Sequence, residues 1–410
     1  MSRHPAGRLG AAFWRFWSVE LATETGLGLA VIALQTMVVL DLGGGASEVG
    51  WLSSARWLPY MVLGLLVGAL VEGMRRRTAM LVSDLVRALV LAGLAVVWLA
   101  GEGALWVLLV AAVLLGAASL VNDAASQAFV PRLVPRQLLL PAHQRLDAGS
   151  NTAQSAGPAV SGAVIAWLGA PVSLLLAAAA HLVSAVVLAT LPRDARTPRR
   201  SGGVGRSIVR GLRYVHRHPM LGPFARWTHV WFLCNGAAMT LLVPLMLLEL
   251  HAGPAGLGLA LGVLGGATLV GTALAGIIAA RLGEGRTVIA TRAAFPLAWS
   301  AVALAGTAHE VLGPWLGWAV LLGGIALAGL AMGAGNPSEM ALRQRATPDG
   351  MQARMNATMR TVNRAMIVVA APLAGLLGDA IGFGPALAIV CVGFAVAAFG
   401  LARSPLARRR

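Results

Sequence analysis

Two glutamates stand four residues apart in the segment WSVELATETG, inside the first long apolar stretch of the chain. Residues at this spacing share one face of a helix, so Glu20 and Glu24 would lie side by side. A rise of about 1.5 Å per residue places Glu24 about 12 Å beyond Phe16, where the stretch begins. Two neighbouring carboxylates in an apolar medium cannot both ionise easily. The pair is therefore a candidate for taking up and releasing a proton or for binding a cation, with Glu24 as the principal acid.

The alternative for Glu24 is a structural ion pair with an arginine such as Arg360 or Arg364. Neutral polar groups in other apolar stretches could supply hydrogen bonds to a cavity, and these are Asn151, Gln154, His229 and Asn235. His229 and Arg226 share a helix face and could contact an anion, although Arg226 could equally extend to the membrane surface. Arg56, near the outer end of its span, and Arg292 could be anchors.

The apolar stretches that carry these residues are long enough to cross a membrane. Of the 410 residues, 58% are hydrophobic and 12% are charged, which leaves too little polar surface for a soluble protein of this size. A membrane helix needs about 20 apolar residues. The sequence predicts twelve spans, at residues 16–40, 50–71, 78–100, 104–129, 148–168, 171–191, 223–248, 255–280, 287–307, 314–337, 359–381 and 385–402.

The basic residues define an orientation for these spans. The chain has no lysine, and its 32 basic residues are all arginines that concentrate in alternate loops and at the two termini. The intervening loops carry acids and no arginine. This distribution follows the positive-inside rule, which places both termini and the arginine loops in the cytoplasm. The net charge of +16 therefore does not indicate a nucleic-acid partner. Cys234 and Cys391 both fall inside predicted spans and suggest no disulfide.

The chain divides into two related halves. We expect an N-terminal six-helix half at residues 1–192, an arginine-rich cytoplasmic linker at 193–222, and a C-terminal six-helix half with a basic tail at 223–410. Prolines recur at a nearly constant spacing in the two halves, and the matched pairs are Pro135 with Pro348, Pro158 with Pro372, and Pro171 with Pro385. Parallel six-helix repeats are typical of transporters whose substrate path lies between the halves. The fold class is therefore an all-α polytopic membrane protein.

The loop after the second span, GALVEGMRRR, resembles motif A of the major facilitator superfamily. Gly68, Glu72, Arg76 and Arg77 fit the motif, whereas Gly73 stands where its first arginine belongs. The matching loop of the second half keeps that arginine as Arg281 but has Ala280 at the acid position. The resemblance implies that these charges lock the halves together on the cytoplasmic side. It also implies that Asp123 is the acid that Arg76 or Arg77 reaches.

A second motif lies on the fifth span. GPAVSG resembles motif C, the antiporter signature, with Ser161 in place of a glycine. Gly157, Ser161 and Gly162 are small residues that let helices approach closely, and Pro158 kinks the span. Close packing without any bearing on transport direction is an equal alternative. The segment SDLVRALV resembles the third span of the same superfamily, and the segments GLRYVHRHPML and LRQRATPD resemble its bacterial branch that contains enterobactin and macrolide exporters.

The resemblance implies a secondary exporter of amphipathic small molecules (a drug, macrolide, siderophore or secondary metabolite) that works by proton antiport and alternating access. We expect a small-molecule substrate, protons as the coupling ion, no cofactor or metal, and a monomer in the bilayer of a bacterial inner membrane. The acids favour cationic or neutral cargo. A Walker A loop needs a lysine, so this chain is not a nucleotide-driven pump, and no catalytic motif indicates an enzyme. A non-transporting receptor or chaperone on the same fold and an importer are the alternatives.

Overall fold

A computed structural model describes residues 9–67, 74–194 and 204–408 of the chain. Within these ranges the chain is helical and contains no strand. The helices are α1 (Ala11–Thr36), α2 (Ala46–Leu63), α4 (Arg76–Leu99), α5 (Leu105–Leu133), α6 (Leu139–Leu168), α7 (Ala170–Thr190), α8 (Val204–Arg217), α9 (Leu221–Pro244), α10 (Gly253–Leu282), α11 (Glu284–Leu312), α12 (Pro314–Arg345), α13 (Asp349–Ile381) and α14 (Phe383–Ala402). Short π-helical turns, Met37–Asp41 and Leu245–Glu249, extend α1 and α9.

Ten helices in the described ranges are long and apolar enough to cross a membrane. They correspond to all predicted spans except the second and the fifth, whose places α2 and α6 take. Polar residues explain the difference. Helix α2 carries Glu48 and Arg56, and α6 is strongly apolar only from Gly157 to Leu168. The prediction of an all-α polytopic membrane protein is confirmed.

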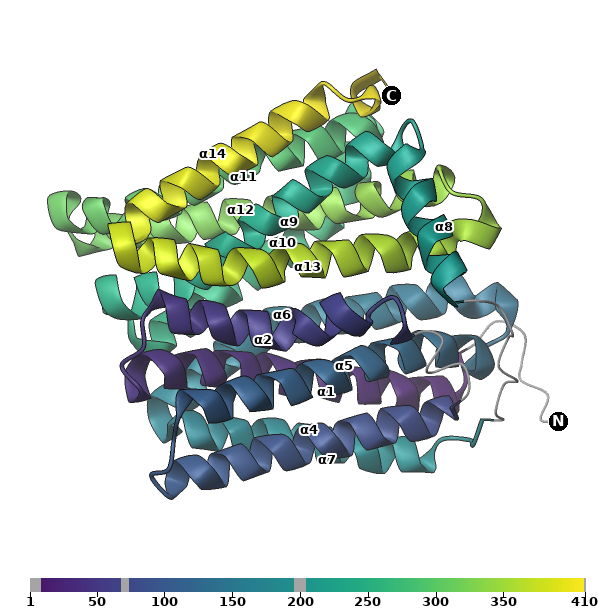
Figure 1. Cartoon of the computed structure of the whole chain (residues 1–410), viewed down its shortest axis with the longest axis horizontal. Helices are drawn as coiled ribbons and strands as arrows, with labels where there is room; N and C mark the ends of the chain where they lie inside the picture. The colour runs from purple at the N-terminus through teal and green to yellow at the C-terminus, as the bar shows by residue number, and fades with distance from the viewer. Residues whose placement is uncertain (1–8, 68–73, 195–203, 409–410) are drawn as a thin grey trace.

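The helices form two groups of six, with α1, α2 and α4–α7 in one half and α9–α14 in the other (Figure 1). The halves meet along two pairs of helices, since α2 packs against α13 and α6 packs against α10 (Figure 1). Helix α8, in the predicted linker, packs against α9 and α13. Four helices, α2, α6, α10 and α13, therefore form most of the interface between the halves.

The last connection of each half shows the sequence repeat in the backbone. Gly169 joins α6 to α7 with a φ of +83°, and Gly382 joins α13 to α14 with a φ of +87°. Glycine adopts this left-handed conformation without the steric cost that a side chain brings. Each of these residues also ends one helix and begins the next, so the two spans reverse direction at a single residue.

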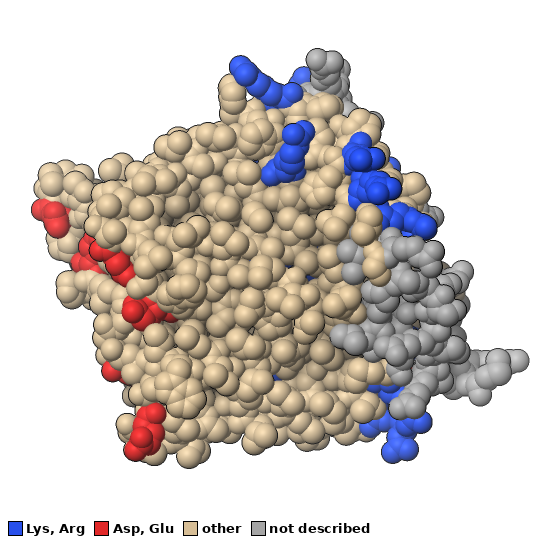
Figure 2. Space-filling view, viewed as in Figure 1, with Lys and Arg blue, Asp and Glu red and all other residues tan. Residues whose placement is uncertain are grey.

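The two ends of the bundle differ in charge. The connections at one end, here called the acidic end, carry Asp41, Glu48, Glu102, Glu249 and Glu310. Figure 2 shows acidic side chains at this end and arginines at the opposite one, here called the arginine end. The first residues of α4, helix α8 and the end of α14 lie at the arginine end (Figure 1). A band of uncharged surface lies between the two ends, as expected for a protein that crosses a bilayer.

The halves are in closest contact toward the acidic end. A Cβ atom on Gly162 of α6 would lie 2.5 Å from the Cα of Gly258 on α10. On the other side of the interface, a Cβ atom on Gly50 of α2 would lie 2.4 Å from the carbonyl oxygen of Ala371 on α13. Asp379 of α13 accepts hydrogen bonds from the first backbone N–H groups of α2, at Ala46 and Ser47, both 2.9 Å long. Backbone-to-backbone packing and this cap close the acidic end.

We predict that Gly162→Ala destabilises the protein by about 1–3 kcal/mol, because the added methyl group overlaps the Gly258 backbone, which cannot rotate away. Thermal melting of the purified protein measures the effect. Gly266→Ala is the matched control on α10, since nothing lies within 4 Å of the added atom. That control should melt at or above the wild-type temperature, because alanine favours a helix by up to about 1 kcal/mol over glycine. Equal melting temperatures for the two variants would contradict the close contact.

Candidate functional site

A cavity of about 330 Å³ lies between the two halves, and α1, α2, α5, α6, α9, α10 and α13 contribute to its wall. Most of the wall is apolar and includes Ile32, Leu52, Met239 and Leu261. Its polar groups are Gln35, Ser53, Arg56, Asn235, Thr240 and Arg364. A concave, mainly apolar site with a few polar groups at the interface of repeats is the usual form of a small-molecule site in a transporter.

The most strongly charged part of the wall is a stack of two arginines on one tryptophan. The guanidinium carbon of Arg364 lies 3.9 Å from the Trp57 ring centroid, and that of Arg56 lies 5.0 Å from it. Both distances are typical of cation–π contacts. Arg364 belongs to α13 and Trp57 to α2, so this contact joins the two halves at the cavity.

The expectation that Arg56 is an anchor at the outer end of a span is wrong. Helix α2 begins at Ala46, four residues before the predicted start, because Glu48 caps it: the Gly45 N–H donates to Glu48 Oε2 at 2.8 Å. Arg56 is therefore ten residues into the helix, or about 15 Å. That depth places its guanidinium at the level of the cavity.

The predicted carboxylates lie on α1 and α5, nearer the arginine end than the residues of these helices that line the cavity. Glu20 of α1 accepts a 2.7 Å hydrogen bond from the Ser126 hydroxyl of α5. Asp123, also on α5, accepts a 2.8 Å hydrogen bond from the Tyr60 hydroxyl. Glu24 is half-buried and within electrostatic range of both Glu20 and Arg56. The three acids thus interact with each other and with the arginine side of the cavity.

Of the other residues predicted for the cavity, Asn235 lies in the wall. The His229 ring is buried in the second half, 2.7 Å from its partner Asn363 Oδ1, and is not among the described lining residues. Asn151 and Gln154 belong to α6, but their side chains lie outside what the structure describes. The predictions missed Trp57 as a cavity residue and assigned Arg364 only as a possible partner of Glu24. The position of Arg364 in an otherwise apolar span could have indicated that it lines the cavity.

Arg76 and Arg77 begin α4 and bind an acid that the sequence did not suggest. Asp194, which follows α7, accepts the backbone N–H of Arg76 at 2.8 Å and lies 3.6 Å from its guanidinium. The Arg77 N–H donates to the other oxygen at 3.3 Å, and its side chain donates to the Leu188 and Ala189 carbonyl oxygens. Asp194 therefore caps α4 and complements its dipole.

The predicted pairing of Asp123 with Arg76 or Arg77 is not what the structure shows. Asp123 is ten residues from the end of α5, or about 15 Å, and it accepts its hydrogen bond from Tyr60. Gly68, Glu72 and Gly73 lie outside the described residues. Arg281 is exposed in the last turn of α10.

The residues that resemble motif C lie where α6 contacts two other helices. Gly157 faces Gly28 of α1, with 3.4 Å between a Cβ atom built on Gly157 and the Gly28 Cα. Ser161 donates a 3.0 Å hydrogen bond to the Leu29 carbonyl oxygen. Gly162 faces α10 across the interface, and Pro158 lines the cavity. This short segment therefore joins the core of the first half, the second half and the cavity.

Each half also contains a buried ion cluster away from the cavity. In the first half Asp84 is 2.9 Å from Arg87 and 3.2 Å from the His181 ring, and Ser184 donates to it at 2.6 Å. In the second half Arg292 lies 2.5 Å from Glu339, and its guanidinium carbon lies 3.9 Å from the Trp231 ring centroid. Arg292 is thus a packed internal residue, which corrects the expectation that it is an anchor.

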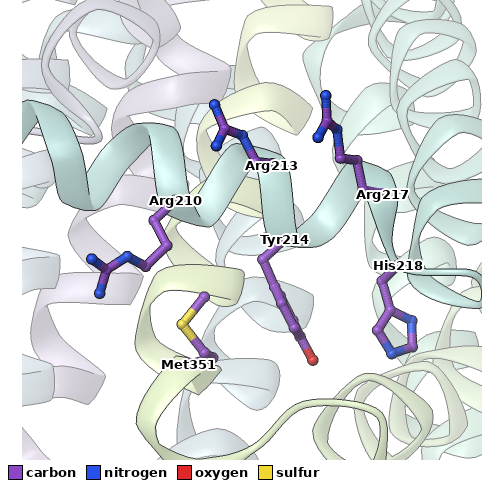
Figure 3. A pocket seen from close by; sticks show the side chains of 6 residues that line it. All are labelled: Arg210, Arg213, Tyr214, Arg217, His218 and Met351. Carbon is purple, nitrogen blue, oxygen red and sulfur yellow. The ribbon is translucent and has the colours of Figure 1, made fainter.

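A second hollow, of about 460 Å³, lies at the arginine end on α8. Figure 3 shows Arg213 and Arg217 projecting from one side of α8, away from Met351, while Arg210, Tyr214 and His218 lie on the side of Met351. The Tyr214 hydroxyl donates a 3.0 Å hydrogen bond to the Ala346 carbonyl oxygen, and His218 Nδ1 accepts the Met220 and Leu221 N–H groups at 3.2 Å. These contacts fix α8 to the second half.

Two six-helix halves with a cavity at their interface define a membrane transporter. The family model described as Major Facilitator Superfamily matches residues 16–319 and 228–409, and the chain belongs to this superfamily. It is 27% identical over 398 residues to the multidrug efflux pump Tap of Mycobacterium tuberculosis, covering 94% of this chain and 92% of that protein. It is 25% identical over 352 residues to an uncharacterised MFS-type transporter, y4rN, of Sinorhizobium fredii, covering 83% of each.

Solved structures share the fold at low sequence identity. The crystal structure of the nucleoside transporter NupG has a TM-score of 0.72 and 11% identity, and the alignment covers 96% of this chain and 98% of that one. A bacterial homologue of the iron transporter ferroportin in an inward-facing state has a TM-score of 0.71 and 14% identity. That alignment covers 95% of this chain and 97% of that one. These similarities extend over both halves and support the twelve-helix arrangement.

For the ion cluster of the first half, we predict that Asp84→Ala alone costs about 3–5 kcal/mol, because it leaves a buried guanidinium without its carboxylate. Arg87→Ala should cost a similar amount for the converse reason. The double variant should be more stable than the sum of the two losses predicts, because it leaves no unpaired charge. Thermal or denaturant unfolding of the four proteins measures the coupling, and strictly additive losses would contradict it.

Proposed function

We propose that this protein is a secondary exporter of amphipathic small molecules, driven by proton entry through alternating access of the central cavity. The observation that carries the proposal is the group of carboxylates inside the first half, Glu20, Glu24 and Asp123, of which Glu24 and Asp123 are within electrostatic range of Arg56 in the cavity wall. Ionisable groups are costly at membrane depth and usually mark a proton or substrate path. The efflux function given for the Mycobacterium tuberculosis relative supports export over import.

In this proposal the arginine end faces the cytoplasm of a bacterium, as the positive-inside rule requires. The contacts that close the acidic end then seal the cavity from the outside, and the structure represents an inward-facing state. Substrate enters the cavity from the cytoplasm or the inner leaflet. The halves then rock to part Gly162 from Gly258 and to release Ala46 from Asp379. A proton from outside binds the carboxylate group, favours the return, and leaves toward the cytoplasm. One chain contains the complete cavity, so we propose that a monomer is the transporting unit.

We predict that Glu24→Gln abolishes proton flux that depends on substrate, because the amide cannot exchange a proton, while the protein still folds. Proteoliposomes with an imposed pH gradient and a panel of lipophilic cations, macrolides and siderophores measure this flux. Glu310→Gln is the matched control, because Glu310 is exposed in the last turn of α11 at the acidic end.

The control should transport like the wild type. Uphill efflux by Glu24→Gln at the wild-type rate would disprove the role of Glu24. Uptake into the compartment on the arginine side, driven by the same gradient, would instead identify an importer.

A further inference from the structure

The two arginines in the cavity wall differ from the arginines in the two ion clusters. Arg87 and Arg292 are paired with Asp84 and Glu339 inside their halves. Arg56 and Arg364 are half-buried inside the bundle, yet no ion pair connects either one to a described carboxylate. A charged side chain in a membrane interior costs several kcal/mol unless something compensates it. Trp57 compensates both through one shared ring.

This stacking leaves their hydrogen-bond donors available. A guanidinium contacts an aromatic ring through its flat face, whereas its five N–H groups lie in the plane and point outward from the edges. Both arginines line the cavity. The Trp57 ring therefore fixes two flat donors against the open space, and a planar fork of this kind matches a carboxylate, sulfonate or phosphate better than any neutral group.

The acids near the cavity do not neutralise these arginines by contact. Glu20 and Asp123 accept hydrogen bonds from the neutral hydroxyls of Ser126 and Tyr60. Glu24 influences Arg56 electrostatically but is not among the described residues that line the cavity, and neither is any other acid. The wall that meets a substrate thus carries positive charge and no described negative charge, which reverses the expectation that the cavity favours cationic cargo.

We propose that the central cavity binds an amphipathic organic anion, whose acidic group lies between Arg56 and Arg364 and whose apolar body faces Ile32, Met239 and Ile367. This inference rests on the proposed function and specifies its substrate class. The two arginines come from α2 and α13, in different halves, so the bound anion links the halves through its oxygens. Asn235 adds selectivity, because its side-chain oxygen has no partner among the described residues and accepts a donor from the substrate body.

The test compares fluorescein with rhodamine 123, which share a xanthene core and carry opposite charge near neutral pH. Binding is measured by fluorescence anisotropy with the full-length protein in nanodiscs of neutral lipid. Fluorescein should bind the wild type at least about tenfold more tightly than rhodamine 123. Loss of one charge-assisted donor pair should weaken fluorescein binding by roughly ten- to a hundredfold in Arg56→Gln and in Arg364→Gln. Arg226→Gln is the matched control, because Arg226 is exposed on α9 and does not line the cavity.

Arg364→Lys adds a variant that keeps the charge and removes the planar fork. It should bind fluorescein with intermediate affinity, and it keeps the test decisive if Arg364→Gln does not fold. Equal or tighter binding of rhodamine 123, no binding of fluorescein, or fluorescein binding that both glutamine variants retain would overturn the inference. Substrate-dependent proton flux with a cationic compound in the proteoliposome assay would leave the exporter proposal standing while the anion site fails.

Discussion

The cost of placing a guanidinium in a low-dielectric interior is the constraint on which this structure depends. Each deeply placed arginine needs a carboxylate, an aromatic face or a ligand. Inside the halves the compensation includes a carboxylate, which is Asp84 for Arg87 and Glu339 for Arg292, and Arg292 also contacts the Trp231 ring. At the interface it is partial, since Arg56 and Arg364 share Trp57. The need to compensate buried arginine charge thus gives each half an internal ion pair, and it leaves two arginines without a carboxylate partner where the halves meet.

The contacts between the halves are of a different kind from those within them. Gly162 against Gly258 and Gly50 against Ala371 are van der Waals contacts of backbone on backbone, and Ser54 donates a 2.5 Å hydrogen bond to the Val368 carbonyl oxygen. Small-residue contacts are a principal means of helix association in lipid, where the hydrophobic effect does not favour it. Separating them exposes little that needs a new partner. The ion clusters keep each half intact during such a movement because they do not cross the interface.

The sequence was sufficient for the features that depend on local composition. Ten of the twelve predicted spans follow from hydropathy, and the separation of acids from arginines follows from the arginine loops. Contacts between distant segments could not be predicted in the same way. The early start of α2, set by Glu48, moved Arg56 from the membrane surface to the cavity. The sequence did not indicate that Asp194 caps α4, because Asp194 follows a span and lies among arginines. It also did not indicate the buried ion pair of Asp84, which lies in the segment SDLVRALV.

The cap that Asp379 forms on α2 is a contact between the halves that the solution at the acidic end can reach. Asp379 belongs to one half, and the N–H groups of Ala46 and Ser47 belong to the other. When the halves part, water can solvate both the carboxylate and the amides, so hydration largely compensates the loss of the two hydrogen bonds. Asp379 and the two N–H groups therefore exchange hydrogen bonds to each other for hydrogen bonds to water at the acidic end. Cations in that solution compete with the helix terminus for the same carboxylate oxygens, so a higher salt concentration at the acidic end weakens this contact between the halves.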